Sequence, residues 1–412
     1  MTKEKSTVPR LRFPGFTDAW KQRKLGEVAT FAKGNGYSKK DLVIKGSPII
    51  LYGRLYTKYE TVISEVDTFV SVEDNKNSVV YSEGGEVLVP ASGESSLDIA
   101  RASVVAKKGI ILGGDINIIR LHSEIFPVFL ALTISNGKQQ KGLSKRAQGK
   151  SVVHLHNSDL KKVDLDFPTL PEQEAIGSFF SDLDQLITLH QRKLDDVKEL
   201  KKALLQKMFP KGNGNDFPEL RFPEFTDAWK QRKLGEVLKE RNESRSPSAD
   251  VPLVSFTVEN GVTPKTERYN REFLVRDEDK KYKFTQLDDI VYNPANLKFG
   301  AIARNKYGAA VFSPIYVTYG VLSEAHPLFV ELIVTSTNFI QRALRYQEGT
   351  VYERMAVKSF DLLRSEIPLP TLPEQEAIGS FFSDLDQLIT LHQRQLDHLK
   401  LLKKALLQQM FI

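Results

Sequence analysis

The 412-residue chain has no cysteine and no long hydrophobic run. Without cysteine, disulfide bonds and cysteine-ligated zinc or iron–sulfur sites are excluded, and the composition fits a reducing cytoplasm. The longest apolar run, Ile125–Ile134, has ten residues with a proline among them, whereas a membrane-spanning helix needs about 20 apolar residues. The N-terminal segment also lacks the apolar core of a secretion signal. We therefore expect a cytoplasmic protein with no membrane partner.

Complete catalytic and cofactor motifs are likewise missing. Ser144–Ser151 has the spacing of a phosphate-binding loop but begins with serine instead of glycine. Asn293–Asn296 reads NPAN, which resembles a motif of amino-methyltransferases without its second proline and its stacking aromatic residue. His154 and His156 would share one face of a strand, but they have no further histidine or acidic neighbours to complete a metal site. We expect no catalytic, cofactor-binding or metal-binding residues in this chain.

The chain does contain an internal repeat. A stretch of 25 residues occurs twice without a change, as Pro168–Arg192 and as Pro370–Arg394. Thr169 and Glu172 have the spacing of a capping box at a helix N-terminus. The pattern predicts a helix from about residue 170 to 208, roughly 57 Å long at 1.5 Å per residue. Pro210 and the glycines after it end this helix, and the second copy predicts a matching one.

The apolar residues of each copy recur at spacings of four and three, which is the seam of a coiled coil. The seam positions are Ile176, Phe180, Leu183, Ile187, His190, Leu194, Val197, Lys201, Leu204 and Met208, then Ile378, Phe382, Leu385, Ile389, His392, Leu396, Leu399, Lys403, Leu406 and Met410. Between the first helix and the next recognisable segment lie only the residues Pro210–Phe217, which reach at most ~28 Å when extended. If the two helices pair, they must therefore run antiparallel.

A second repeat shows that the whole chain is a tandem duplication. Pro9–Val28 returns with few changes as Pro218–Val237, and each copy is followed by a variable region and a long helix. The two variable regions show no obvious similarity to each other. The predicted divisions are residues 1–167 for the entry segment and first globular domain, 168–210 for the first helix, 211–369 for the linker, repeated entry segment and second globular domain, and 370–412 for the second helix.

Both variable regions mix short strands with helices. In the first we expect strands at Val87–Pro90, Ala102–Ala106, Asp115–Leu121 and Val152–Leu155, with a helix starting within Phe126–Ile134. In the second we expect strands at Asp289–Tyr292, Ala301–Arg304 and Ile315–Tyr319, with a helix over His326–Arg345. This irregular mixture predicts an α+β fold: two globular domains joined by two long antiparallel coiled-coil helices, a duplication with pseudo-twofold symmetry.

Signals for binding are stronger than signals for catalysis. The net charge of +6 favours a polyanionic partner. No acidic residue occurs between Glu124 and Asp159 or between Asp289 and Glu324, and both stretches carry basic residues among Asn and Gln. Basic side chains suit phosphate contacts, whereas Asn, Gln and Arg can bond base edges in the major groove. Either stretch alone could be a solvated basic face, but one in each variable region favours nucleic acid.

Each of the two unlike regions is followed by the repeated sequence PTLPEQEAIGSFFSDLDQLITLHQR, and the copies end in KKALLQKMF and KKALLQQMF. This arrangement resembles the specificity subunit of type I restriction-modification systems. The resemblance spans the whole chain. It implies that the variable regions are target recognition domains, each reading one half of a bipartite, asymmetric DNA site. It also implies that the helices set the gap between the half-sites and dock two methyltransferase subunits.

The resemblance further implies a division of labour within a multisubunit complex. The chain would direct adenine N6-methylation and restriction without catalysing either. S-adenosylmethionine would be bound by the methyltransferase subunits, and ATP and Mg²⁺ would serve separate restriction and translocase subunits. No cofactor is expected on this chain.

The resemblance also places a loop before each helix, around Gly149 in the first domain and Gly349 in the second. From these loops and the acid-free stretches we predict contacts with double-stranded DNA by basic, amide and aromatic side chains. They are Lys145, Arg146, Gln148, Lys150, Asn293, Asn296, Lys298, Arg304, Arg345, Tyr346, Gln347 and Tyr352.

Two other functions fit parts of the pattern. A coiled-coil adaptor with two protein-binding heads would have no salt-sensitive affinity for DNA and no partner enzyme. A stand-alone methyltransferase would bind S-adenosylmethionine by itself, and the incomplete motifs argue against it.

Overall fold

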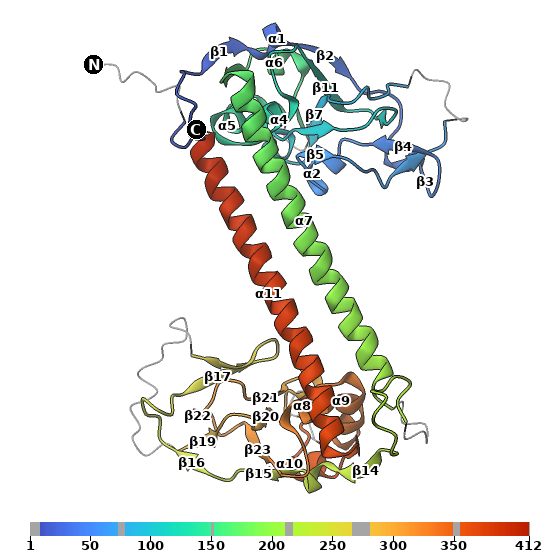
Figure 1. Ribbon diagram of the computed structural model, residues 1–412, viewed down its shortest axis with the longest axis vertical. Coiled ribbons are helices and arrows are strands. Elements are labelled where there is room, and N and C mark those ends of the chain that lie inside the picture. The colour runs from blue at the N-terminus through green and yellow to red at the C-terminus, as the bar shows by residue number, and fades with distance from the viewer. Residues whose placement is uncertain are drawn as a thin grey trace. The chain divides into compact units, whose positions relative to one another are not determined.

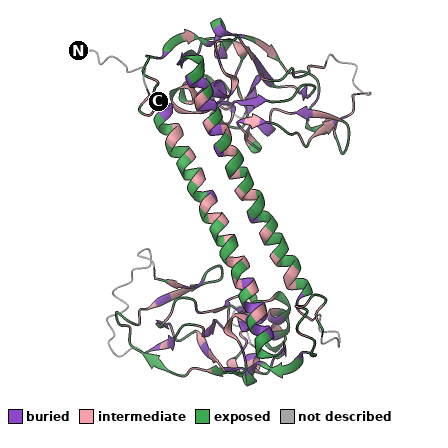
Figure 2. Ribbon diagram, viewed as in Figure 1, coloured by how far each residue is buried: buried purple, intermediate pink, exposed green. Residues whose placement is uncertain are grey.

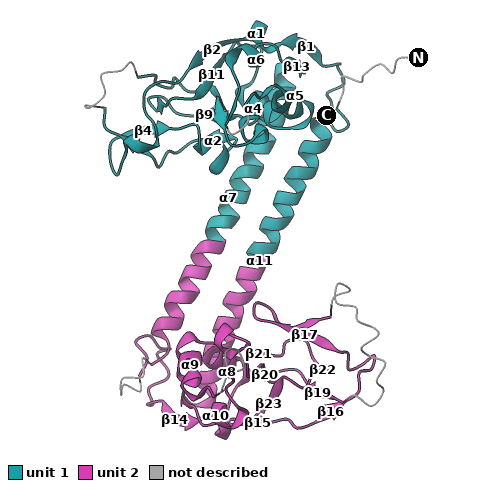
Figure 3. Ribbon diagram, turned by 180° about the vertical axis from the view of Figure 1, so that it is seen from behind, with its two compact units in different colours: residues 1–193, 392–412 teal, residues 194–391 magenta. Residues whose placement is uncertain are grey.

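A computed structural model of the chain describes residues 9–72, 79–149, 152–210, 217–265, 281–348 and 355–411. The chain forms two compact units: unit 1 comprises residues 1–193 and 392–412, and unit 2 comprises residues 194–391 (Figure 3). The long helix predicted from about residue 170 is α7, Leu170–Lys207, and its repeat is α11, Leu372–Met410. Each helix contributes one part to unit 1 and the other part to unit 2, so the units cut across the predicted helix segments.

The head of unit 1 is built on a five-stranded sheet. Its order is β2 (Ala29–Lys33), β11 (Ile116–Leu121), β7 (Val87–Pro90), β9 (Ser103–Val105) and β5 (Val62–Ile63). A second sheet has the order β10 (Ile111–Leu112), β4 (Ser47–Ile50), β6 (Phe69–Val70) and β3 (Leu42–Val43). The buried helix α4 (Pro127–Ser135) packs on β7 and β9 and leads into α5 (Gly137–Arg146) (Figure 1).

Shorter elements complete unit 1. Two further strand pairs are β1 (Lys21–Lys24) with β13 (Asp164–Phe167), and β12 (Val153–His154) with β8 (Ser92–Gly93). The short helices are α1 (Leu25–Val28), η1 (Lys39–Asp41), α2 (Arg54–Thr57), α3 (Ser96–Ile99) and α6 (Asn157–Leu160).

The head of unit 2 has a four-stranded sheet of order β15 (Leu238–Glu240), β23 (Val317–Val321), β20 (Ile290–Tyr292) and β21 (Ile302–Arg304). Smaller sheets join β16 (Ser244–Arg245), β19 (Tyr282–Thr285) and β22 (Ala310–Phe312), then β17 (Val254–Thr257) with β18 (Gly261–Pro264), and β14 (Lys230–Lys233) with β24 (Glu366–Leu369). The helices are η2 (Leu234–Glu236), η5 (Leu297–Phe299), α8 (Pro327–Val334), α9 (Thr337–Ala343), η6 (Leu344–Tyr346) and α10 (Ser359–Leu363).

The two heads share one plan although their sequences differ. The order β2-β11-β7-β9 in unit 1 corresponds to β15-β23-β20-β21 in unit 2, and both series are antiparallel throughout. The helix pair α4 and α5 corresponds to α8 and α9. The expected α+β class is therefore confirmed for each head.

The segment His326–Arg345 was expected to be helical, and most of it is: α8, α9 and η6 cover it, with a break at Thr335 and Ser336. The Ser336 hydroxyl accepts a hydrogen bond from Phe339 N, so it caps a new helix. The predicted strands at Val87–Pro90, Ile315–Tyr319 and elsewhere match β7, β23 and their neighbours within one or two residues at most ends.

The predicted seam is the face that the long helices bury. Every seam residue is buried or partly buried, and Figure 2 shows that more and less exposed residues alternate along both long helices. In unit 1, Lys403 pairs with Asp184, and His190 Nδ1 lies 3.2 Å from His392 Nδ1. In unit 2, Lys201 Nζ lies 2.5 Å from Asp386 Oδ1. Within each unit higher residue numbers of one helix meet lower numbers of the other, so the helices run antiparallel.

The glutamate of the repeated PEQ sequence has a different partner from the one predicted. Both oxygens of Glu172 accept hydrogen bonds from the Arg12 guanidinium, at 2.8 and 2.6 Å, instead of serving the first turn of the helix as a capping box. Glu374 is held in the same way by Arg221, at 2.7 Å to each oxygen. The pair therefore ties each entry segment to the start of the long helix in its own unit.

The glutamine of the same sequence joins each helix to its head. The Gln173 amide accepts from Phe126 N at 2.9 Å and donates to the carbonyls of Glu124 and Pro168. Gln375 makes the matching three bonds, with His326 N, Glu324 O and Pro370 O. Because both glutamines are fully buried, the repeated sequence fixes where each helix enters its core.

The aromatic residue near the end of each helix repeat closes the core. Phe411 packs against Phe129 and Phe180 in unit 1, with ring centroids 5.9 and 6.4 Å away. Phe209 packs against Phe329 and Phe382 in unit 2, at 5.8 and 6.4 Å. Each core therefore contains the start of one long helix and the end of the other.

Candidate nucleic-acid interface

In unit 1 the predicted DNA-facing residues follow one another at the end of α5. Lys145 and Arg146 are the last residues of this helix and are exposed. Gln148 is also exposed, and its backbone pairs with His154, with N–O distances of 3.1 and 2.7 Å. That pairing starts a turn back toward β12 and fixes the backbone of Gln148. Lys150 lies outside the described residues.

In unit 2 the corresponding residues follow α9. Arg345 and Tyr346 are exposed residues of η6. Gln347 donates from Nε2 to Met355 O at 3.0 Å. The backbones of Glu348 and Ala356 pair in the position that Gln148 and His154 occupy in unit 1. Tyr352 lies outside the described residues.

A second predicted group in unit 2 divides into exposed and internally bonded residues. Asn296 and Lys298 are exposed on and beside η5, next to Phe299, which is 62% exposed. Asn293 is buried, and its Oδ1 accepts from Ala295 N at 3.1 Å. Arg304 donates to Asp288 at 2.5 Å and to Glu331 at 2.9 Å.

The placement of Asn293 and Arg304 corrects their prediction as DNA-facing residues. The Asn293 side chain closes a turn, and the Arg304 charge is already balanced by two carboxylates. A guanidinium held between two acids would have to break both pairs before it could contact a phosphate. Asn296 and Lys298 remain available on the same turn.

Backbone hydrogen bonds bring the two groups of unit 2 together. Val357 N donates to Pro294 O at 3.1 Å, and the Tyr292 hydroxyl donates to Val357 O at 3.0 Å. The chain that returns from the η6 loop therefore lies on the turn that carries Asn296. Both segments contribute to one edge of the head.

The equivalent turn of unit 1 was missed by the sequence prediction. Leu155 N donates to Ala91 O at 2.9 Å, and β12 pairs with β8, so the chain after Gln148 returns onto the Ser92–Ser95 turn. Ser92 Oγ lies 3.0 Å from His154 Nδ1. The sequence could have revealed this turn by its position, because each of the two turns directly follows a buried strand, β7 or β20.

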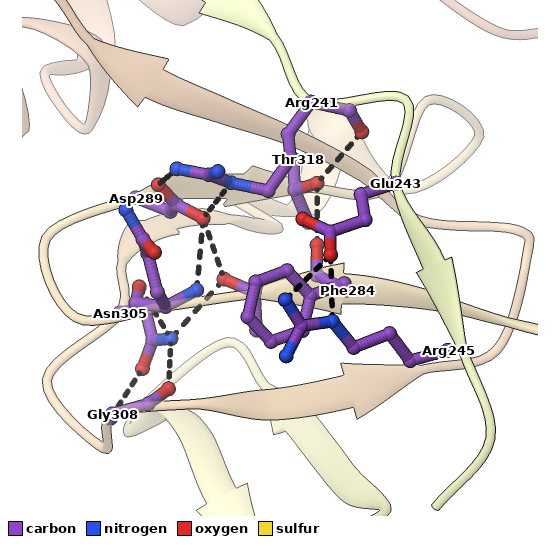
Figure 4. Close-up of polar contacts among 10 residues, drawn as sticks. Arg241, Glu243, Arg245, Phe284, Asp289, Asn305, Gly308 and Thr318 are labelled. Atoms are coloured by element: carbon purple, nitrogen blue, oxygen red, sulfur yellow. Dashed lines mark hydrogen bonds and ion pairs between the residues drawn. The ribbon is translucent and has the colours of Figure 1, made fainter. Parts of the chain in front are cut away.

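A buried polar network fixes the strand that leads to the turn of unit 2 (Figure 4). Arg241 donates to both oxygens of Asp289 at 2.8 and 2.9 Å, and this hydrogen bonding raises the pKa of Arg241. Asp289 also accepts from Gln286 N at 2.9 Å, and Asn305 donates to Gly308 O at 2.8 Å. Asp289 directly precedes β20, so the network holds the strand that positions Asn296.

Each edge offers cations beside amide side chains on a backbone that hydrogen bonds hold in place. Lys145 and Arg146 in unit 1, and Lys298 and Arg345 in unit 2, suit contacts with phosphate oxygens. Gln148 and Asn296 have the paired donor and acceptor that base edges require, and Gln347 keeps its amide oxygen and a second N–H beside the bond to Met355 O.

The described residues contain no group of three or more His, Cys, Asp or Glu side chains that could hold a metal ion. In the same part of the chain, no helix has the length and apolar character needed to cross a membrane.

Comparison with known proteins gives one consistent family. The model of the type I restriction modification DNA specificity domain matches residues 17–199 and again residues 226–401. Two curated relatives from Methanocaldococcus jannaschii are the putative type I restriction enzyme MjaX specificity subunit, 23% identical, and the type I restriction enzyme MjaVIII specificity subunit, 22% identical. The matches cover 94% and 96% of this chain, and 92% of each relative.

A solved structure has a similar fold. It is the S subunit of a type I restriction-modification system from M. genitalium, with a TM-score of 0.63 at 14% sequence identity. The match covers 98% of this chain and 99% of that chain.

Proposed function

Because the chain belongs to the type I restriction modification DNA specificity family, we propose that it is the DNA-reading subunit of a type I restriction-modification complex. Each head is a target recognition domain that reads one half of a bipartite site. The chain acts in the cytoplasm and catalyses no reaction itself; it directs the methylation and cleavage that its partners perform.

The observation that carries this proposal is the combination of one scaffold with two unlike heads. The shared strand order places an exposed basic helix end and a polar turn at the same position in each unit. The residues there differ, with Lys145, Arg146 and Gln148 in one unit and Arg345, Tyr346 and Gln347 in the other. Two heads that share a fold but expose different residues favour a split DNA site whose halves have different sequences.

The repeated helices supply the proposed partner surface. Leu186 and Leu189 of α7 are 40% and 47% exposed, and their repeats Leu388 and Leu391 of α11 are 38% and 50% exposed. Apolar residues repeated on the outer side of a helix pair suit an apolar helix of another protein. We assign them to two methyltransferase subunits, which bring S-adenosylmethionine. Restriction and translocase subunits bring ATP and Mg²⁺ chemistry.

The test is a map of N6-methyladenine across DNA from cells that express this chain with its methyltransferase subunit, compared with cells that lack only this chain. We expect a split, asymmetric motif that is present only with the chain. Identical maps from the two strains, with the complex shown to assemble, would overturn the proposal and favour the protein-binding adaptor.

Two matched variants sharpen the test. Gln148→Ala should relax base preference in one half-site, and Gln347→Ala should relax it in the other, each at a cost of about 1–3 kcal/mol in discrimination. If both variants changed the same half-site, the assignment of one half-site to each head would be wrong.

A further inference from the structure

Unit 1 contains a basic pocket at the junction of α5 and the end of α11. Its volume is about 730 Å³, and all its lining residues belong to unit 1. Six of them are cationic side chains: Arg10, Lys138, Lys141, Lys400, Lys403 and Lys404. The single carboxylate in the lining is that of Asp184.

Most of the positive charge in this basic pocket is not neutralised by the protein. Lys403 pairs with Asp184, whose other oxygen accepts from Thr61 Oγ1 at 2.9 Å, and Lys138 pairs with Asp166. Within the described ranges, the other four cations, Arg10, Lys141, Lys400 and Lys404, make no ion pair. Like charges gathered in one concavity repel one another, so an anion there would relieve an existing cost.

The walls of the basic pocket are fixed even though its lysines are long. Gly137, at φ +60°, lies so close to Phe411 O that a Cβ atom would come within 2.1 Å of it. Arg10 N donates to Gln409 O at 3.1 Å, which holds the entry segment against the end of α11. The pocket therefore presents its cations from three segments held together by close backbone contact.

Unit 2 does not reproduce this charge. Its long helix keeps Lys198, Lys201 and Lys202 at the positions of Lys400, Lys403 and Lys404, because the helices are repeats. The other three cations of the basic pocket are replaced, Arg10 by Glu219, Lys138 by Asn338 and Lys141 by Gln341. The concentration of cations is thus a property of unit 1 alone among the described parts of the two heads.

The chemistry of the lining identifies the class of ligand. Five of the six cations are lysines, compact point charges that suit contacts with phosphate oxygens. The one aromatic residue in the lining, Phe411, is 5% exposed because its ring packs against Phe129 in the core. It therefore cannot stack on a free nucleotide base. A string of phosphates fits this lining better than a single nucleotide does.

The basic pocket is also continuous with the predicted DNA-facing residues. Lys138, Lys141 and Lys145 follow one another at spacings of three and four along α5, so they share one face of the helix. These seven steps cover about 10 Å, the length of roughly three phosphates at 3.4 Å per strand. The far end of this face carries Lys145 and Arg146.

We propose that the basic pocket binds the phosphodiester backbone of the half-site that the head of unit 1 reads, and that unit 2 has no equivalent phosphate-binding site. The inference rests on the proposed function. It makes the two half-sites unequal in backbone contact as well as in sequence.

The experiment compares two matched double variants in the assembled complex with its methyltransferase subunits. Lys400→Ala with Lys404→Ala removes two pocket cations, and Lys198→Ala with Lys202→Ala removes the same residues from the repeat in unit 2. All four side chains are exposed, so both variants should fold and assemble. Binding to duplex DNA carrying the methylated motif is measured from low to high salt.

In the pocket variant, we expect the slope of log affinity against log salt to become shallower by about 2, one for each lost phosphate contact. Affinity should fall equally for matched and mismatched half-sites. The control variant should keep the wild-type slope. Equal slopes in all three proteins, or an equal change in both variants, would overturn the inference.

A second measurement separates contact from general attraction. Single phosphates of the half-site read by unit 1 are replaced with uncharged methylphosphonates. Where the basic pocket holds a phosphate, replacing that phosphate should weaken binding by the wild type. The same replacement should have no further effect on the pocket variant, as a double-mutant cycle requires. Additive effects at every phosphate would reject the site.

The outcomes also separate this inference from the proposed function. Failure of the wild-type complex to prefer its motif would reject the proposed function. Specific binding by the wild type with no coupling at the pocket would reject the pocket alone. Loss of methyltransferase assembly in the pocket variant, with an unchanged DNA slope, would identify the pocket as a protein contact and overturn the inference.

Discussion

At the scale of single residues, each unit contains a buried ion pair between its entry segment and the start of its long helix. Glu374 is fully buried and accepts from Arg221 and from Trp229 Nε1, the latter at 3.2 Å. Glu172 holds the equivalent place with Arg12 in unit 1. A buried pair adds little compared with an apolar replacement, but loss of one partner leaves a buried charge without compensation. The arginine in the entry segment and the glutamate in the helix are therefore interdependent.

We predict that Glu374→Gln destabilises unit 2 by about 3–5 kcal/mol, because Arg221 loses its counter-charge in a buried setting. The measurement is urea unfolding followed by the fluorescence of Trp229 in a Trp20→Phe background, since the chain has two tryptophans. Glu376→Gln, two residues along the same helix and exposed, is the matched control and should leave the midpoint unchanged. Equal midpoints for the two variants would show that the pair does not stabilise the unit.

The predicted interface illustrates what single residues do and do not reveal in a sequence. Lys145 was predicted to face DNA because it lies in an acid-free stretch, and Arg345 because it lies beside the loop before the second long helix; both side chains are exposed. Asn293 and Arg304 were misplaced because their partners are set by the fold: Glu331 lies 27 residues from Arg304 and reaches it only through the packing of α8 on β21. The acid-free stretch ends at Glu324, so the balancing carboxylate stood just outside it.

At the scale of elements, the long helices could be predicted almost to the residue, whereas the heads could be predicted only in part. The seam repeats over ten positions in each helix, and every position is buried or partly buried. Strands such as β7 and β11 were visible as apolar runs. The two-residue strands β3, β5 and β6 have no pattern long enough to be recognised, because their existence depends on neighbours that are distant in sequence.

The likeness of the two heads was hidden for a related reason. Val89 and Ile119 of unit 1 occupy the positions of Tyr292 and Tyr319 in unit 2, where the two rings stack with centroids 5.8 Å apart. Burial of the Tyr319 ring raises the pKa of its hydroxyl to about 12. Aliphatic and aromatic side chains fill the same place with different volumes, so the topology is shared while the residues are not.

The exposed leucines of the helices yield a prediction about assembly. Leu186→Ser with Leu189→Ser should weaken binding of one methyltransferase subunit by roughly 100-fold, since burial of two exposed leucine side chains in an interface contributes about 3 kcal/mol. Leu388→Ser with Leu391→Ser should do the same for the other copy. Native mass spectrometry should then show complexes with one methyltransferase subunit in place of two.

The control for these variants is Gln185→Ala with Thr188→Ala, which changes exposed polar residues on the same helix. It should retain two methyltransferase subunits. If the leucine variants also retained both copies at submicromolar concentration, the docking surface would lie elsewhere.

At the scale of the whole molecule, the duplication separates what is repeated from what is free to vary. The helices, the entry segments and the contacts between them are nearly identical in the two halves, down to the paired Arg12–Glu172 and Arg221–Glu374 bonds. The reading edges are built from unlike residues. A head can therefore differ in its exposed residues without disturbing the helices.

The continuity of the helices leads to the last prediction. Both α7 and α11 pass unbroken from one unit into the other. Seven residues inserted after Gln191 in α7 and after Gln393 in α11 preserve the spacing of the seam and lengthen each helix by about 10 Å. At 3.4 Å per base pair this is roughly three base pairs. We expect the methylated motif to keep both half-sites and to gain about three base pairs in its gap.

A second variant carries an insertion of four residues in α7 alone, between Gln206 and Pro210. It should also alter the gap without changing either half-site, although less predictably, because only one helix is lengthened and the seam loses its register. The readout in both cases is the map of N6-methyladenine. A changed half-site sequence in the seven-residue variant would mean that the heads do not read DNA independently. An unchanged gap would mean that something other than helix length sets the spacing, and the helices would then serve assembly alone.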